Sequence, residues 1–135
     1  MAARAQLVPE VIRPALDAGK IVVADRFVLA TVVYQGYGLT LKSDELWKVG
    51  HFATNNTLPD HTIVLDLDVE QAAARREGTA DRMESRDIHY FQKLRKGFLA
   101  EAKKQPDCIS IVDASQSIEA IHSDIQKVVR PLLKS

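Results

Sequence analysis

The sequence predicts an α/β fold in which helices cover a parallel sheet. Three short apolar runs, each typical of a buried strand, alternate with longer stretches in which apolar residues recur at helical spacing. These runs are Ile21–Ala24, Thr62–Leu67 and Ile109–Val112. No internal repeat or low-complexity linker interrupts the alternation, which is typical of strands joined by helical crossovers. We therefore expect the 135 residues to form a single domain.

The first helix is expected over Ala2–Ala18, and Gly19 should end it. No capping residue precedes this helix. Pro9 lies inside the helical pattern. A proline costs about 3 kcal/mol in a helix interior, because it lacks an N–H group and crowds the preceding turn. The sequence therefore predicts a kink or a break near Pro9.

Two further helices are expected between the first and second strands. One follows the pair Asp25-Arg26 and should end at Gly36 and Gly38. The next should be capped by Ser43 and should end at Asn55-Asn56. Its buried side is predicted to consist of Leu46, Trp47, Val49, Gly50 and Phe52.

The second half of the chain should contain three helices. Asp68 and Gln71 stand at the spacing of a capping box, so a helix is expected over 69–77. A long helix over 88–105 should end before Pro106. Ser117 should cap a last helix that runs to about residue 133. Its inward side is predicted to consist of Ile118, Ile121, Ile125, Val128, Val129 and Leu132.

An acid and a guanidinium follow the first apolar run directly. In open α/β sheets, ligands bind outside the carboxyl ends of the strands, which is where Asp25 and Arg26 should lie. Arg26 offers a planar fork that binds phosphate through two hydrogen bonds, and Asp25 can orient that fork, accept a proton or hold a metal-bound water. The pair can equally be structural, with Asp25 capping the next turn and Arg26 reaching solvent. The local sequence leaves both interpretations open.

Arginines gather around Gly78. They are Arg75, Arg76, Arg82 and Arg86. Guanidinium groups beside a glycine hinge can close over phosphates and neutralise the charge that develops during phosphoryl transfer. A solvated helix face explains the same cluster. The histidines, by contrast, show no metal-ligand spacing, and we predict no zinc site.

Composition limits the partners of the chain. Lys and Arg total 18, as do Asp and Glu, so no net charge attracts the chain to nucleic acid or to a membrane surface. No apolar run approaches the ~20 residues that a membrane helix needs. The single cysteine, Cys108, cannot form an internal disulfide, and its apolar neighbours predict a buried side chain. We expect a cytoplasmic protein with no nucleic-acid partner and no membrane segment.

Several motifs have counterparts, in the same order, in one known family. They are Ala2-Ala3-Arg4, Asp25-Arg26-Phe27 followed by Ala30-Thr31-x-x-Tyr34-Gln35-Gly36, Asp81-Arg82-Met83-Glu84, and Tyr90-Phe91 with Arg95. In this order they resemble the thymidylate (dTMP) kinase family. The resemblance implies a three-layer, P-loop-kinase-like α/β fold with a parallel sheet. It also implies transfer of the γ-phosphoryl group of ATP to dTMP, with a lid at about residues 75–87.

The sequence lacks the phosphate loop of that family, Gly-x-x-x-x-Gly-Lys-Ser/Thr, whose amides and lysine cradle ATP while its hydroxyl holds Mg²⁺. Only Gly19 precedes a lysine, Ile21 follows that lysine, and Pro14 stands in the place of the first glycine. The chain therefore resembles the carboxyl-terminal two-thirds of the family, truncated so that the first two strands and the phosphate loop are absent. We expect the chain as given to be inactive by itself.

The resemblance also bears on the sheet. In the family, another strand lies between those that resemble Ile21–Ala24 and Thr62–Leu67. Without it, the two runs should pair directly, leave a gap in the sheet, or borrow a strand from a second copy of the chain. We predict direct pairing or oligomerisation, the latter as a homodimer.

The resemblance assigns the acceptor nucleotide to residues in the first half of the chain. Arg4 would contact the nucleotide and Arg26 would hold its phosphate. Asp25 would orient Arg26 and the water shell of the Mg²⁺ that accompanies ATP. Thr31 would meet the thymine edge. Tyr34 would lie against the sugar and disfavour a 2′-hydroxyl.

The remaining implied roles fall on Gln35 and on the arginines of the lid. Gln35 belongs to the same substrate-binding motif as Tyr34. Arg76 and Arg82 would belong to the lid. A basic lid resembles the bacterial type, in which the lid rather than the phosphate loop supplies the catalytic arginine.

Three functions remain open. The first is a thymidylate kinase, acting on dTMP and ATP, of which this chain is a part. The second is a catalytically silent nucleotide-binding or interaction module that retains the fold. The third is a kinase for another nucleoside monophosphate or for a deoxynucleoside, which Asp25-Arg26 alone permits but Tyr34-Gln35-Gly36 disfavours.

Overall fold

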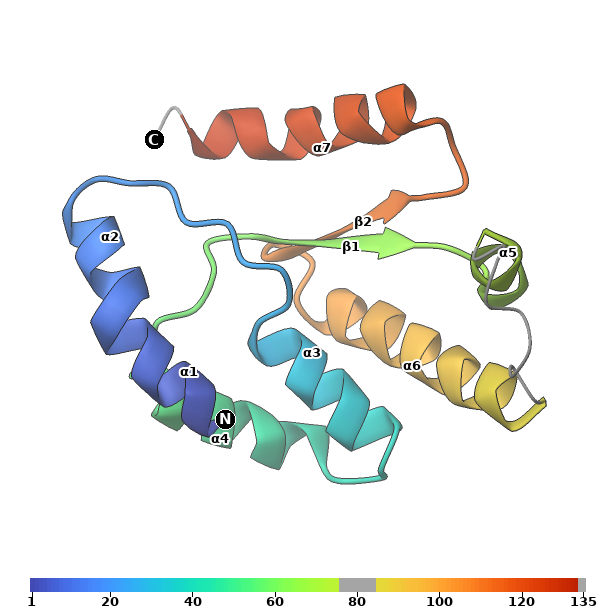
Figure 1. The fold of residues 1–135 in the computed structure, drawn as a ribbon, viewed down its shortest axis with the longest axis horizontal. Coiled ribbons are helices and arrows are strands. Elements are labelled where there is room, and N and C mark those ends of the chain that lie inside the picture. The colour runs from blue at the N-terminus through green and yellow to red at the C-terminus, as the bar shows by residue number, and fades with distance from the viewer. Residues whose placement is uncertain (76–84, 134–135) are drawn as a thin grey trace. The chain divides into compact units, whose positions relative to one another are not determined.

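The computed structural model describes residues 1–75 and 85–133 (Figure 1). The chain divides into two compact units, Met1–Pro59 and Asp60–Ser135. Helices build the first unit, and a two-stranded sheet with helices builds the second. The single domain expected over residues 1–135 stays a prediction. Most of the proposed lid also stays a prediction, because residues 76–84 lie outside the described part.

A continuous helical stretch opens the first unit. It consists of α1 (Ala2–Leu7), the π-helical turn η1 (Val8–Ile12) and α2 (Arg13–Asp17). The predicted irregularity at Pro9 is confirmed, since Pro9 lies within the π-helical turn. Pro9 has no N–H group to donate to the preceding turn, and the helix adjusts by bonding Arg13 N–H to Val8 O, five residues back.

Two more helical segments complete this unit and enclose its core. They are α3 (Val28–Val32) continued by η2 (Val33–Tyr37), and α4 (Ser43–Ala53). The core contains the buried side chains of Val28, Val32 and Leu46 and the partly buried side chains of Met1, Phe27, Trp47 and Leu58. The predicted helices are therefore confirmed, and the core arises where their apolar sides meet.

Two details of α4 differ from the prediction. Lys42 occupies the cap position and Ser43 is the first helical residue, so the predicted cap is wrong by one position. Val49 and Phe52, predicted to be buried, are exposed, and Phe52 is 89% exposed. The buried side of α4 is narrower than its apolar stripe, because only Leu46 and Gly50 are fully covered.

The run Ile21–Ala24 forms no strand, and this prediction is wrong. Its side chains are exposed, with Val23 91% exposed. An isolated extended segment cannot satisfy its own N–H and C=O groups, and only hydrogen bonds to a neighbouring strand stabilise it. Within the described residues the sheet contains only two strands, paired with each other, so direct pairing of 21–24 with the strand at Thr62 is also wrong.

The second unit has the predicted crossover arrangement. Strands β1 (Thr62–Asp66) and β2 (Ile109–Asp113) pair in parallel, in a register that runs from Thr62 opposite Ile109 to Asp66 opposite Asp113. The helices are α5 (Val69–Ala74), α6 (Ser85–Lys104) and α7 (Ile118–Leu132). Within this unit, α6 and α7 lie on either side of the sheet (Figure 1).

Side-chain caps start two of these helices. Asp68 Oδ1 accepts a hydrogen bond from Glu70 N–H at 2.9 Å, and Ser117 Oγ accepts one from Ala120 N–H at 3.3 Å. Both residues are the caps predicted from the sequence. Asp68 uses a different amide from that of Gln71, the other member of the predicted capping box.

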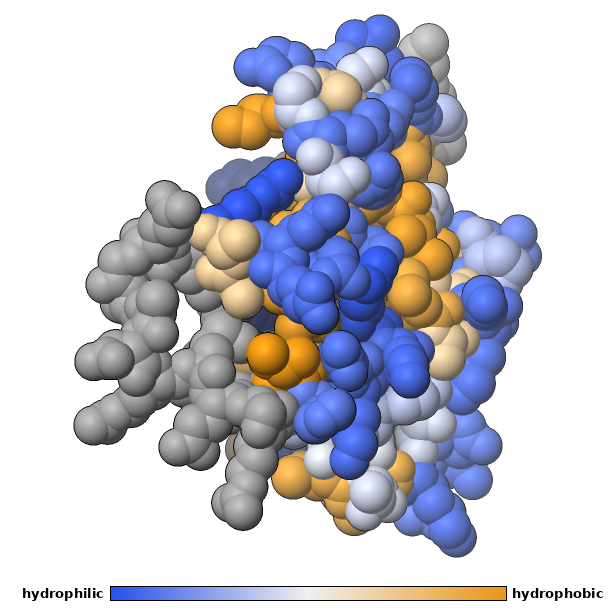
Figure 2. All heavy atoms as spheres, turned by 90° about the vertical axis from the view of Figure 1, so that its right-hand side faces the viewer, coloured by the Kyte–Doolittle hydropathy of each residue, from blue (hydrophilic) through white to orange (hydrophobic). Residues whose placement is uncertain are grey.

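Several side chains predicted to face inward in this unit are exposed, among them Leu65 and Ile111 in the strands and Leu132 near the end of α7. Cys108 lies exposed in the turn before β2, and Ile118 in the first turn of α7 is 81% exposed. Figure 2 shows hydrophobic side chains at one face of the molecule among hydrophilic ones. Within the described ranges, none of the helices combines the length and the apolar character needed to cross a bilayer.

We predict that Gly50→Ala destabilises the first unit. A Cβ atom on Gly50 would overlap Cγ1 of Val28, a stiff and fully buried side chain. Alanine improves helix propensity by about 1 kcal/mol, but overpacking costs about 1–3 kcal/mol, so the loss should prevail. Urea unfolding followed by circular dichroism measures the difference.

Lys48→Ala, at an exposed position of the same helix, is the control and should change the free energy of unfolding by less than about 0.5 kcal/mol. In Val28→Ala/Gly50→Ala the effects of the two changes on the free energy of unfolding should be strongly non-additive. The methyl group that is added at position 50 fills space that Val28→Ala leaves empty. A Gly50→Ala protein that is more stable than the unchanged chain would refute this packing.

Candidate functional site

Arg4 joins the first helix to the turn that contains Asp25 and Arg26. Arg4 Nη2 donates to the backbone carbonyl of Phe27 at 2.7 Å, and the guanidinium carbon lies 5.7 Å from the centroid of the Phe27 ring. That position lies within the range of a cation–π interaction. Partial burial lowers the pKa of Arg4, although an arginine side chain remains protonated in proteins.

Arg26 has an uncommon backbone conformation. Its φ angle is +65°, in the left-handed region that non-glycine residues seldom adopt. The guanidinium carbon of Arg26 lies 5.6 Å from the centroid of the Tyr34 ring. The guanidinium of Arg26 therefore lies over an aromatic face close to the start of α3.

The polar residues expected to meet the base and sugar lie on the helical segment that follows. Thr31 is in α3, whereas Tyr34 and Gln35 are in the π-helical turn η2. Positions three and four residues apart share one helix face, so these side chains start from the same side. Thr31 and Tyr34 are half-buried and Gln35 is exposed. Such π-helical turns are frequent at functional sites.

The structure thus brings together several of the predicted residues. Arg4 contacts Phe27, Arg26 follows directly before it, and Arg26 contacts Tyr34. Asp25 is exposed beside Arg26, and no ion pair joins the two, although both are among the described residues. The aromatic ring, rather than Asp25, contacts the Arg26 guanidinium. Arg76 and Arg82 lie outside the described residues. The functional roles of all these residues stay predictions.

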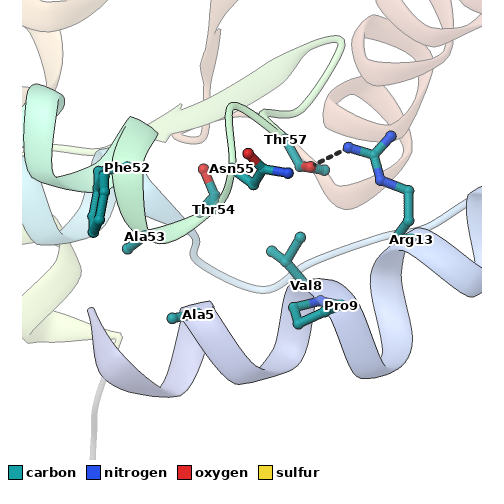
Figure 3. A pocket seen from close by; sticks show the side chains of 9 residues that line it. All are labelled: Ala5, Val8, Pro9, Arg13, Phe52, Ala53, Thr54, Asn55 and Thr57. Atoms are coloured by element: carbon teal, nitrogen blue, oxygen red, sulfur yellow. Dashed lines mark hydrogen bonds between the residues drawn. The ribbon is translucent and has the colours of Figure 1, made fainter.

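A separate pocket of about 360 Å³ lies in the same unit (Figure 3). It opens between the first helical stretch and the end of α4, and Arg13 Nη2 donates to Thr57 Oγ1 across it at 2.6 Å. None of its lining residues belongs to the predicted site. They are Ala5, Val8, Pro9, Arg13, Phe52, Ala53, Thr54, Asn55 and Thr57.

The second unit contains a polar cluster to which sequence reasoning gave no role. Arg95 of α6 donates from Nε and Nη2 to the two oxygens of Asp66 at 2.8 and 3.0 Å, and from Nη1 to Asp68 Oδ2 at 2.8 Å. Hydrogen bonding to Asp66, above all, raises the pKa of Arg95. The sequence contains one signal for this cluster, the two carboxylates Asp66 and Asp68 at the end of a predicted strand. That signal does not indicate that Arg95 is their partner.

Metal ligands are sparse in the described part of the chain. No group of three or more His, Cys, Asp or Glu side chains gathers there. Mg²⁺ usually keeps several waters and is held by one or two carboxylates together with substrate phosphates. Exposed Asp25 can supply one such carboxylate. The rest of the shell would have to come from a nucleotide and water.

The sequence pattern of the thymidylate kinase family matches residues 1–125 of this chain. The chain belongs to the thymidylate kinase family. The resemblance inferred from the Asp-Arg, Tyr-Gln-Gly and Asp-Arg-x-Glu motifs is therefore confirmed.

Individual thymidylate kinases align with nearly the whole chain. The thymidylate kinase of Exiguobacterium sibiricum is 44% identical over 135 residues, which cover 98% of this chain and 64% of that protein. The thymidylate kinase of Symbiobacterium thermophilum is 44% identical over 133 residues, which cover 98% of this chain and 62% of that protein. The chain thus spans less than two thirds of the length of these relatives.

A solved thymidylate kinase supports the fold class. The crystal structure of thymidylate kinase from Ehrlichia chaffeensis superposes with a TM-score of 0.70 at 26% sequence identity. The superposition covers 93% of this chain and 58% of that chain. The predicted P-loop-kinase-like α/β class is confirmed by this likeness, with the correction that the run at residues 21–24 is not a strand.

We predict that Arg26→Gly is more stable than Arg26→Ala by about 0.5–1 kcal/mol, because only glycine adopts a left-handed backbone without strain. Both substitutions remove the guanidinium, so the comparison isolates the backbone. The same pair at Lys48, inside α4, should show the opposite order, with alanine more stable by about 1 kcal/mol. Urea unfolding compares the four variants. Equal stability at position 26 would contradict the assigned turn.

Proposed function

We propose that this chain forms the acceptor side of a thymidylate kinase, an enzyme that transfers the γ-phosphoryl group of ATP to the 5′-phosphate of dTMP and releases ADP and dTDP. One observation carries the proposal. Within the first unit, Arg4, Arg26 and Tyr34 are connected through contacts around Phe27, in a chain that belongs to this family. Two guanidinium groups, each beside an aromatic ring of its own, suit a nucleoside monophosphate, which carries phosphate, sugar and base.

The acceptor roles follow from the chemistry of these side chains. Arg26 binds the 5′-phosphate through its planar fork, and Arg4 contacts the nucleotide next to it. The ring of Tyr34 lies against the sugar and leaves no room for a 2′-hydroxyl. Thr31 and Gln35, polar side chains on the same helical segment, contact the thymine edge.

The donor side requires further groups. Asp25 would supply one carboxylate to the water shell of Mg²⁺, which neutralises the phosphates of ATP when bound. Arg76 and Arg82 stabilise the charge on the transferring phosphoryl group. The sequence given contains no Gly-x-x-x-x-Gly-Lys-Ser/Thr loop. We therefore propose that this chain alone does not hold ATP productively and does not turn over.

Phosphoryl transfer tests this division. The purified chain with ATP, Mg²⁺ and dTMP should form no dTDP above background, as measured by chromatography of the nucleotides. A chain in which the strand and phosphate loop of a thymidylate kinase precede Met1 should form dTDP. In that extended chain, Arg26→Ala should lower kcat/KM by about 100-fold, since two charge-assisted hydrogen bonds to phosphate are lost.

The outcomes separate the candidate functions. Turnover by the chain given would contradict the need for the loop. If the extended chain binds dTMP but does not turn over, a catalytically silent nucleotide-binding or interaction module is favoured. This module is the second candidate because the sequence given lacks the loop motif. Faster turnover of another monophosphate than of dTMP would point to a different nucleotide kinase.

We also propose a cytoplasmic homodimer. The single cysteine suits a reducing compartment. Large apolar side chains are exposed on the first unit, among them Leu7, Val11, Val49 and Phe52, and a second copy of the chain can cover them. Sedimentation velocity should give twice the mass of the chain at micromolar concentration. A monomer at the highest soluble concentration would contradict the dimer.

A further inference from the structure

Helix α5 in the second unit depends on anchors at both of its ends. It has only six residues, Val69–Ala74, and an isolated helix of that length is unstable in water. At its start, Asp68 Oδ1 accepts from Glu70 N–H at 2.9 Å. At its end, Arg75 donates from Nη1 to Ala114 O at 2.9 Å and from Nη2 to Ser115 O at 3.4 Å.

The first of these anchors is itself held by Arg95. While one oxygen of Asp68 caps α5, the other accepts from Arg95 Nη1 at 2.8 Å. The same guanidinium grips both oxygens of Asp66, the last residue of β1, at 2.8 and 3.0 Å. Three donors of one planar group thus connect α6, the end of β1 and the cap of α5.

This connection spans a long segment of chain. Asp68 and Arg95 are 27 residues apart, so the bond fixes the start of α5 relative to α6. The Arg95 side chain is 34% exposed and that of Asp66 21%, which shields the pair partly from solvent. A lysine carries one compact charge and cannot span both carboxylates in this geometry.

We propose that Arg95 is a positioning residue that holds α5, and with it Arg75, at the carboxyl edge of the sheet. It acts through Asp68 and Asp66 and touches no substrate. Its importance for catalysis rests on the proposed function, because the chain passes from Arg75 directly into Arg76, one of the residues assigned to phosphoryl transfer.

Hydrogen exchange of the full chain, measured by mass spectrometry without nucleotide, tests the clamp itself. Arg95→Lys should raise the exchange rates of amides 69–75 about tenfold and those of β1 and β2 less than about twofold, because the charged hydrogen bonds are local. Arg130→Lys is the matched control. Arg130 also donates to a side chain, Gln126 Oε1 at 2.8 Å, but at an exposed position of α7, and its substitution should leave amides 69–75 unchanged.

A second variant shows whether Arg95 acts through Asp68. Asp68→Ser keeps an oxygen that can cap α5 but removes the carboxylate that Arg95 holds. It should raise the same exchange rates. In the double variant Arg95→Lys/Asp68→Ser, the exchange rates of amides 69–75 should exceed those in Arg95→Lys by less than about twofold. Unchanged exchange at 69–75 in Arg95→Lys, an equal rise throughout the second unit, or fully additive effects would each overturn the proposal.

The link to catalysis is read in the extended chain that carries a phosphate loop. There, Arg95→Lys should lower kcat about tenfold and leave KM for dTMP within about twofold, because the acceptor residues belong to the first unit. An unchanged kcat, or an equal rise in KM, would overturn the link. If the unsubstituted extended chain forms no dTDP, the proposed function fails, and hydrogen exchange still decides whether Arg95 holds α5.

Discussion

Backbone pairing between the two parallel strands is the constraint on which the second unit depends. Strands β1 and β2 are in register along five residue pairs and bond through those N–H and C=O groups that face the partner strand. The carboxyl ends of both strands therefore meet at Asp66 and Asp113, and Ala114 N–H donates to Asp66 O at 2.8 Å just beyond. This shared edge is where Arg95 and Arg75 find their acceptors.

The same constraint explains the first unit, all of whose residues are described. An α-helix satisfies most of its own backbone groups, whereas a strand needs a neighbour. The unit consists of helical segments, and its one strand-like run, Ile21–Ala24, stays exposed and unpaired. Where proline removes a donor, at Pro9, the helix continues through a π-helical turn instead of ending. Local hydrogen bonding thus decides which parts of this chain become regular.

Five of the described arginines connect segments or lie against aromatic rings. Arg95, Arg75 and Arg13 donate to carboxylate, carbonyl or hydroxyl oxygens that belong to other segments, and they connect those segments. Arg4 and Arg26 lie over the rings of Phe27 and Tyr34, and Arg4 also donates to the Phe27 carbonyl, so that it connects two segments as well. A ring holds the plane of a guanidinium through its face, while the N–H groups at the edge of that plane can still meet a phosphate.

The sequence by itself determined the helices, the two paired strands, the caps Asp68 and Ser117 and the family, because these depend on local periodicity, on side chains close in sequence and on short motifs. It could not determine whether Ile21–Ala24 is a strand, since that depends on a partner elsewhere. Nor could it show that Arg95 meets Asp66 and Asp68, or that Phe52 and Ile118 remain exposed. These features depend on which surfaces come together in three dimensions, and an apolar or charged side chain does not specify its partner until the fold brings one within reach.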